Sequence, residues 1–170
     1  LWEAVFPRMC EGPDTFVGFE GSLLEAARGF AGAARRSHMT EEDVLVMDVP
    51  GLPGPDASVL GWSIGERLQT KIRCARLKLQ YSADDFALTP VGWARRFDDG
   101  DRRATLVSHL LRRLMDEPAD VVLVPPIMGI EFHAHLMDIL GESAPGRVME
   151  LLGGPGWPPG LRLARCLDEA

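Results

Sequence analysis

Arg162 follows a loop rich in glycine and proline, and this combination could hold an anion. The loop runs from Gly153 to Gly160 and precedes a predicted helix from Leu161 to about Glu169. The first amides of a helix lack partners within the helix, and the helix dipole favours negative charge there. A guanidinium in the first turn would add donors suited to phosphate. The alternative is a rigid connection with a surface arginine, and the sequence leaves both open.

His133 and His135, with Glu131 and Asp138, form the one group in the sequence whose side chains suit a metal ion. Residues three or four apart share a helix face, so Glu131 and Asp138 can each lie beside His135. The two histidines, however, point in different directions, and a third or fourth ligand is not visible. The pattern favours a solvated helix face, and we predict no metal site.

Asp48 lies near the end of a predicted strand, where it could act as an acid or base or bind a ribose hydroxyl. A solvated carboxylate facing a loop is the favoured alternative. Ser63 lies in a Gly-x-Ser-x-Gly pattern at residues 61–65, but these residues fall inside a predicted helix and not at a strand-to-helix turn, so a serine hydrolase is not indicated. The chain also has no Gly-x-Gly-x-x-Gly or Walker pattern, so it shows no motif for a dinucleotide or a nucleoside triphosphate.

Two predicted buried strands end at prolines and a glycine, which marks each end as a strand-to-helix corner. Residues 121–124 are four consecutive aliphatics, and two prolines and Gly129 follow them; residues 44–49 end in the same way at residues 50–55. Proline cannot continue a ladder, and an apolar run without alternation suits a strand covered on both faces. Such corners line the crevice where ligands usually bind in open α/β sheets, although a plain connection is the alternative.

Helical and strand patterns alternate through residues 41–170 and predict a single type of architecture. We expect strands at residues 44–49, 72–80, 121–124 and 147–152, with helices at 57–70, 91–97, 102–115 and about 131–140. The alternating residues at 72–80 are typical of an edge strand with one solvated face. The predicted fold class is α/β, with a small, mainly parallel sheet of about four strands flanked by helices, Rossmann- or flavodoxin-like.

Residues 1–40 are expected to form an N-terminal arm and a helix, separate from the α/β domain of residues 41–170. The helix is predicted between Ser22 and Arg36, because apolar residues recur there at helical spacing. Ser22 and Glu25 also have the spacing of a capping box.

Composition limits the classes of function. The net charge of −7 disfavours a nucleic-acid surface, and we interpret the paired arginines at 95–96, 102–103 and 112–113 as solvated faces. Three cysteines without close spacing indicate neither a disulfide framework nor a zinc site, so we expect a reducing, cytoplasmic compartment. No apolar run reaches about 18 residues, so no membrane span is predicted. The chain opens at Leu1 in the middle of a pattern, and we expect a fragment of a longer polypeptide.

Four stretches, taken in order, resemble the middle portion of the B-type component of anaerobic glycerol-3-phosphate dehydrogenase, a flavin-linked family. The stretches are residues 46–52, residues 94–98 with the helix that follows, residues 123–130 and residues 155–163. The likeness covers about residues 44–165. The chain departs from the family pattern at residues 156–158, where Gly-Trp-Pro stands in place of Pro-Ser-Val.

This resemblance implies an inserted substrate or cap domain of a flavin-dependent dehydrogenase, inactive by itself. The longer polypeptide of which this chain would be a part, called the parent below, would transfer hydride from glycerol 3-phosphate or a similar alcohol to FAD or FMN. It would pass the electrons to a quinone. The flavin would be bound mainly by sequence outside this chain. The partners implied are the flavin-binding part of the same polypeptide and other dehydrogenase subunits, with any membrane association only through them. The binding residues implied are Gly51, Gly129, Gly160 and Arg162, and the catalytic residues are unknown.

A second hypothesis makes the same domain a non-catalytic interaction module. It would link a flavin subunit to its electron-transfer partners and bind no small molecule. An exposed apolar patch around Trp157, Trp2 or Phe6 would be its expected docking surface.

Overall fold

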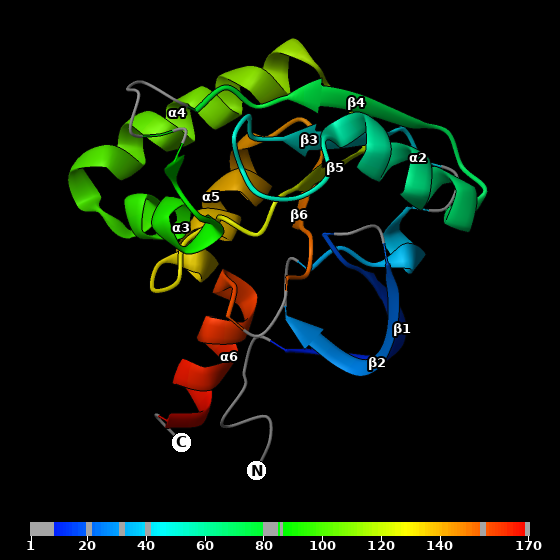
Figure 1. Ribbon diagram of the computed structural model, residues 1–170, viewed down its shortest axis with the longest axis horizontal. Coiled ribbons are helices and arrows are strands. Elements are labelled where there is room, and N and C mark those ends of the chain that lie inside the picture. The colour runs from blue at the N-terminus through cyan, green and yellow to red at the C-terminus, as the bar shows by residue number, and fades with distance from the viewer. Residues whose placement is uncertain are drawn as a thin grey trace.

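A parallel sheet of four strands forms the centre of the molecule, in the order β4-β3-β5-β6 (Figure 1). The computed structural model describes residues 9–19, 22–30, 33–39, 42–79, 85, 87–153 and 156–168. The strands are β3 (Val44–Asp48), β4 (Ile72–Arg76), β5 (Val121–Val124) and β6 (Arg147–Glu150). The predicted α/β class with a small parallel sheet is confirmed.

The burial of each strand explains its sequence pattern. All residues of the central strands β3 and β5 are buried, which is why neither strand shows polar alternation. The strand β4 is partly exposed and lies at one end of the sheet, as its alternating sequence predicts. At the other end, isolated parallel bridges join Ala33 to Glu150 and Gly18 to Leu152, so the N-terminal segment pairs with the chain around β6.

Helices cover both faces of the sheet (Figure 1). On one face, α2 (Ala57–Leu68) packs in a hydrophobic cluster together with Val17, Phe19, Ala34 and Met39 of the N-terminal segment. The other face is covered by α3 (Pro90–Asp98), α4 (Gly100–Asp116) and α5 (His133–Ser143). The last helix is α6 (Pro158–Asp168). Within the described ranges, no helix is both long enough and apolar enough to cross a membrane.

The predicted helix between Ser22 and Arg36 is wrong. This segment contains β2 (Leu23–Phe30), which pairs antiparallel with β1 (Met9–Val17), and a short 3-10 helix, η1 (Arg36–His38), follows. The local spacing of apolar residues cannot reveal a strand partner that lies elsewhere in the sequence, and pairing with that partner overrides a modest helical pattern.

The strand order reverses between β3 and β5, and this reversal locates the candidate site. After β3 the chain passes through α2 to β4, and then crosses back through α3 and α4 to β5 on the other side of β3. The loops that leave β3 and β5 therefore diverge toward opposite faces of the sheet. Sheets of this kind bind their ligands at the carboxyl ends of the two strands where the order reverses.

Candidate functional site

The corner after β5 is closed by a carboxylate from α3. Asp98 accepts hydrogen bonds from the amides of Ile130, Glu131 and Phe132, with N···O distances of 2.9, 3.1 and 3.1 Å. These amides lie just before α5, where unpaired N–H groups favour a negative charge. Gly129 has a φ of 82°, and a Cβ there would lie 2.8 Å from Asp98 Oδ1, so glycine permits this close approach. The amides that could hold a ligand's anion are thus occupied by the protein itself.

A buried ion pair supports the same corner. Glu150 and Arg162 are 3% and 6% exposed and are paired with each other. Arg162 Nη1 donates to the carbonyl oxygen of Gly129 at 2.6 Å, and the amide of Met128 donates to Glu150 Oε1 at 2.8 Å. His133 Nε2 lies 3.2 Å from Glu150 Oε2. The structure therefore brings two of the predicted site residues, Gly129 and Arg162, together by a direct hydrogen bond, and Glu150, which the sequence analysis did not single out, pairs with the arginine.

The charge of Glu150 decides whether the Arg162 guanidinium is available to a ligand. Burial raises the pKa of Glu150, but the charge of Arg162, the contact with His133 and the amide of Met128 lower it by more, so the pKa lies below its ordinary value of 4.5. Glu150 is therefore ionised at neutral pH. The Arg162 guanidinium is held by Glu150 and Gly129 and is almost wholly buried, so it positions the corner and presents little surface to a ligand.

The predicted solvated face of α5 is correct for three residues and wrong for one. Glu131, His135 and Asp138 are exposed, whereas His133 is buried beside Glu150. His133 and His135 point in different directions, as their spacing requires, so only one of them can face the end of β6. Among the residues that the structure describes, no group of three or more His, Cys, Asp or Glu is arranged to hold a metal ion.

The corner after β3 is open, in contrast to the corner after β5. A pocket of about 220 Å³ lies there, and its wall includes Asp48, Gly51, Asp56 and Arg76. Gly51 has a φ of 83°, a backbone conformation that glycine adopts without strain, and it turns the loop directly after β3. One predicted site residue therefore lies at an open pocket, while Gly129 and Arg162 lie in the closed corner.

Asp48 lies in the wall of this pocket and has a buried oxygen without a partner among the described residues. Its Oδ2 accepts from the amide of Ala57 at 3.1 Å, whereas its Oδ1 is buried and has no hydrogen-bond partner among the described residues. A buried polar atom left unpaired costs about 1–3 kcal/mol, so such an oxygen calls for an explanation. The solvated carboxylate that the sequence favoured for Asp48 is wrong, because β3 is covered on both faces as far as its last residue.

Arg76 brings a positive charge to the same pocket. It is the last residue of β4 and lies in register with Asp48 on β3. The pKa of Asp56 is lowered by hydrogen bonds from the Ser58 hydroxyl and the Val59 amide, and the charge of Arg76 adds to this effect. The pocket thus offers an acceptor for a hydroxyl and a cation for an acidic group. The sequence analysis missed Arg76, because the strand order alone places it beside Asp48.

Gly160 lies apart from the open pocket. The structure places it in the first turn of α6, which begins at Pro158 and so starts inside the loop predicted for residues 153–160. Proline suits the first helical positions because its fixed φ is helical and its missing amide has no partner there in any case. The predicted loop is therefore shorter than expected.

Comparison of this chain with models of protein families, with curated proteins and with solved structures finds no match.

Proposed function

We propose that this chain is the inserted substrate or cap domain of a flavin-dependent dehydrogenase that oxidises glycerol 3-phosphate or a similar alcohol. Two features support the proposal: the order of four sequence stretches, which resembles the B-type component of anaerobic glycerol-3-phosphate dehydrogenase, and a parallel sheet with an open pocket after β3. The observation that carries it is Asp48, which lies in the wall of that pocket and whose buried Oδ1 has no hydrogen-bond partner among the described residues. A substrate hydroxyl is a donor that this oxygen can accept.

The dimensions of the pocket favour a small substrate. At about 220 Å³ the pocket is smaller than the roughly 300–1,000 Å³ of sites for drug-sized ligands, so it suits a short hydroxylated acid better than a flavin. Arg76 would face the acidic end of such a molecule, and Asp48 its hydroxyl. The FAD or FMN, which would accept the hydride, belongs in this proposal to the rest of the polypeptide. Electrons would then pass to a quinone, and the domain would be cytoplasmic, reaching a membrane only through its partners.

The replacement Asp48→Asn separates a role in binding from a role in folding. Asparagine can still accept from the amide of Ala57, but it removes the charged acceptor that faces the pocket. We expect the melting temperature of the chain to stay the same or rise, because a buried charge with an unpartnered oxygen is lost. We expect the affinity of the full-length parent for glycerol 3-phosphate to fall by about tenfold or more, since a charge-assisted hydrogen bond is lost.

The visible spectrum of the purified full-length parent tests the proposal. Flavin bands that bleach on anaerobic addition of glycerol 3-phosphate support it, and the substrate concentration needed for half bleaching gives the affinity. Asp101→Asn, the same change at an exposed position in α4, serves as the matched control. A parent without flavin would remove the dehydrogenase assignment. A lower melting temperature for Asp48→Asn with unchanged bleaching would make Asp48 a structural residue.

The interaction module is the second candidate, and the structure offers it a surface on α2. Trp157 is partly buried, with its ring centroid 5.2 Å from that of Phe19, and Trp2 and Phe6 lie outside the described residues. On α2, however, Trp62 and Val59 are 69% and 54% exposed and lie one turn apart. Exposed apolar side chains on one helix face suit a contact with a flavin subunit or another dehydrogenase subunit.

Replacing Trp62 with alanine is expected to leave the melting temperature of the chain within about 2 °C, because the side chain is mostly exposed. If the module hypothesis holds, the same change weakens assembly of the parent with its dehydrogenase subunits by about tenfold or more, as for an aromatic contact at an interface. Size-exclusion chromatography of the parent with its subunits measures this. Thr70→Ala, just beyond the end of the same helix, is the control. Unchanged assembly for both variants would contradict a docking role for α2.

A further inference from the structure

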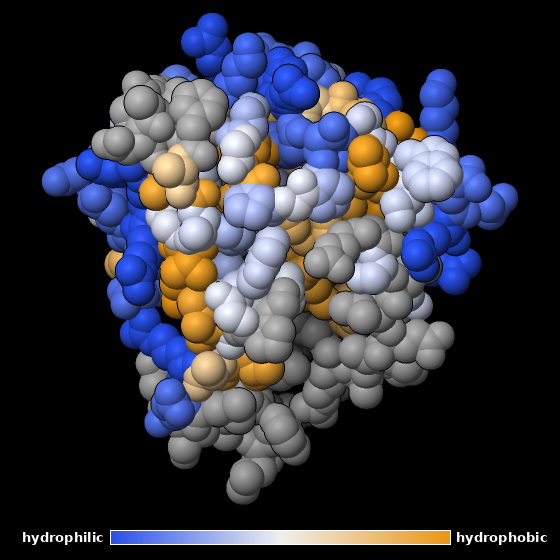
Figure 2. Space-filling view, in the orientation of Figure 1, coloured by the Kyte–Doolittle hydropathy of each residue, from blue (hydrophilic) through white to orange (hydrophobic). Residues whose placement is uncertain are grey.

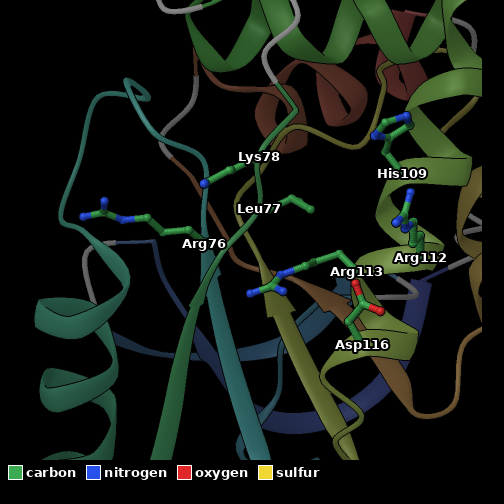
Figure 3. Close-up of a pocket in the computed structure, with 7 residues that line it drawn as sticks. All are labelled: Arg76, Leu77, Lys78, His109, Arg112, Arg113 and Asp116. Carbon is green, nitrogen blue, oxygen red and sulfur yellow. The ribbon is translucent and has the colours of Figure 1, made fainter.

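A second pocket, of about 340 Å³, lies between the edge strand β4 and the helix α4 (Figure 3). Four basic residues line it, Arg76, Lys78, Arg112 and Arg113, together with Leu77, His109 and Asp116. We propose that this pocket binds the phosphate group of a small molecule. The proposal does not depend on the proposed function, because its binding groups, apart from Arg76, are separate from those of the pocket at Asp48.

The helical spacing of α4 produces the basic face. His109, Arg112, Arg113 and Asp116 follow one another at intervals of three, one and three residues, which places all four on the same side of a helix. The side of α4 that carries Leu110 and the other apolar residues packs into the core. In Figure 3, Arg113 extends from α4 toward β4, and Arg112 and His109 lie further along the same helix. The arginine pair that the sequence suggested to be a solvated face therefore lines a pocket.

The charge of this pocket is opposite to that of the chain. The whole chain carries a net charge of −7, whereas the residues that line this pocket include four basic ones, of which Arg113 is paired with Glu117, and a single acidic one, Asp116. Figure 2 shows hydrophilic residues gathered along the edge of the molecule where α4 and β4 lie. A local concentration of one sign of charge attracts ligands of the other sign.

Arg113 has a donor without a hydrogen-bond partner among the described residues. Its Nη2 pairs with Glu117, one turn further along α4, but its Nε is buried and has no hydrogen-bond partner among the described residues. A buried N–H without an acceptor is uncommon in native proteins and is costly. Rotation of the Arg113 side chain toward the adjacent pocket would bring this N–H to an oxyanion bound there.

The edge strand adds a backbone donor. The amide of Leu77 donates to the carbonyl oxygen of Asp48 at 2.7 Å and so points toward β3. Successive amides of an extended strand point to opposite sides, so the amide of Arg76 points toward the outer edge of the described sheet. In Figure 3, the side chains of Arg76 and Lys78 extend away from the side chain of Leu77. Leu77 extends toward α4, so Arg76 and Lys78 lie on the side of β4 that faces away from α4, and the strand contributes an amide at the rim of the pocket.

These donors suit a phosphate group better than other anions. Guanidinium groups form paired hydrogen bonds with phosphate oxygens. A tetrahedral phosphate has several oxygens, so it can accept hydrogen bonds from α4 and from β4 at the same time. The volume of about 340 Å³ lies in the usual range for a small-molecule site. A nucleic acid is disfavoured, because its binding depends on basic residues spread over a surface and this chain is acidic overall.

The direct test is titration of the full chain with inorganic phosphate, followed by amide chemical shifts in two-dimensional NMR at constant ionic strength. We expect saturable shifts at residues 76–78 and 109–116, and none with chloride. Arg112→Gln should weaken phosphate binding by about tenfold, because a charge-assisted contact is lost. Arg102→Gln is the matched control, since it removes the same charge from an exposed position of the same helix outside the pocket. Arg112 is exposed, so both variants should fold.

Several outcomes would overturn the proposal. Equal weakening by Arg112→Gln and Arg102→Gln would show general charge screening, and shifts confined to other residues would show binding elsewhere. Vesicles of anionic lipid that bind to the chain and are not displaced by phosphate would assign the basic face to a membrane surface. A partial recovery of phosphate binding in Arg112→Lys would support the assignment, because lysine restores the charge but not the paired geometry.

Discussion

Replacement of Glu150 by glutamine is expected to lower the free energy of unfolding by about 3–5 kcal/mol at pH 7. The change leaves the guanidinium of Arg162, which is 6% exposed, without a counter-charge in the interior. It also weakens the acceptor for the amide of Met128 and removes the charge beside His133. The loss is measured by urea denaturation of the two proteins under the same conditions, with the slope of the transition checked for two-state behaviour.

Two further proteins make this result specific. Glu142→Gln, the same change at an exposed position of α5, should alter the free energy of unfolding by less than about 0.5 kcal/mol. Arg162→Met combined with Glu150→Gln should lower the free energy of unfolding by less than the sum of the two single changes. Each single change leaves one buried charge without its partner, whereas the double change removes both charges. Strictly additive losses would show that the two side chains are not coupled.

The pH dependence of this effect has a defined sign. The pKa of Glu150 is lower in the folded chain than its ordinary value of 4.5, so its contribution to stability is complete above that value. This contribution is lost as the pH falls through the folded pKa. The difference in melting temperature between the chain and Glu150→Gln should therefore be largest near neutral pH and become smaller below about pH 4.5. A difference that stays constant down to acid pH would contradict a depressed pKa.

Replacement of Asp98 by alanine is the second large effect that we expect, with a loss of about 2–3 kcal/mol. The three amides of Ile130, Glu131 and Phe132 lose the carboxylate that they share, and the turn before α5 loses its attachment to α3. The emptied group of amides at the start of a helix should then accept an external anion. We expect acetate or formate to recover part of the lost stability, which thermal denaturation at constant ionic strength can measure.

The recovery by acetate distinguishes a specific carboxylate site from a general loss of packing. Asp101→Ala, in the first turn of α4, removes a carboxylate of the same size without touching the β5 corner, and acetate should not change its stability beyond the effect of chloride. If acetate and chloride act alike on Asp98→Ala, the amides do not form an anion site. That result would also mean that Asp98 acts mainly by filling space beside Gly129.

Local burial patterns were sufficient to predict most elements of the sheet. The aliphatic runs of β3 and β5 reflect strands covered on both faces, and the apolar spacing of α2 and α4 reflects helices with one buried face. Each of these patterns depends only on neighbours within one element, so a single sequence contains them. The segment of β2 was mistaken for a helix because its structure depends on pairing with β1, which no local pattern records.

The tertiary structure places the predicted site residues in two separate corners of the sheet. The glycines that follow β3 and β5 could be recognised, because glycine and proline mark the ends of strands locally. Their roles could not, because Asp98 comes from a different helix to close one corner, and the other corner is left with a pocket whose wall includes Asp48, with its buried and unpartnered oxygen.

The α/β class, the order of its elements and the glycines and prolines at the strand ends could all be recognised in the sequence, since they follow from local periodicity and backbone limits. Which charges meet depends instead on how the elements assemble. Arg162 could be seen as a cation near a loop, but its partner Glu150 lies in a different element. The adjacency of Arg76 to both Asp48 and the basic face of α4 follows from the strand order β4-β3-β5, which is a property of the assembled sheet.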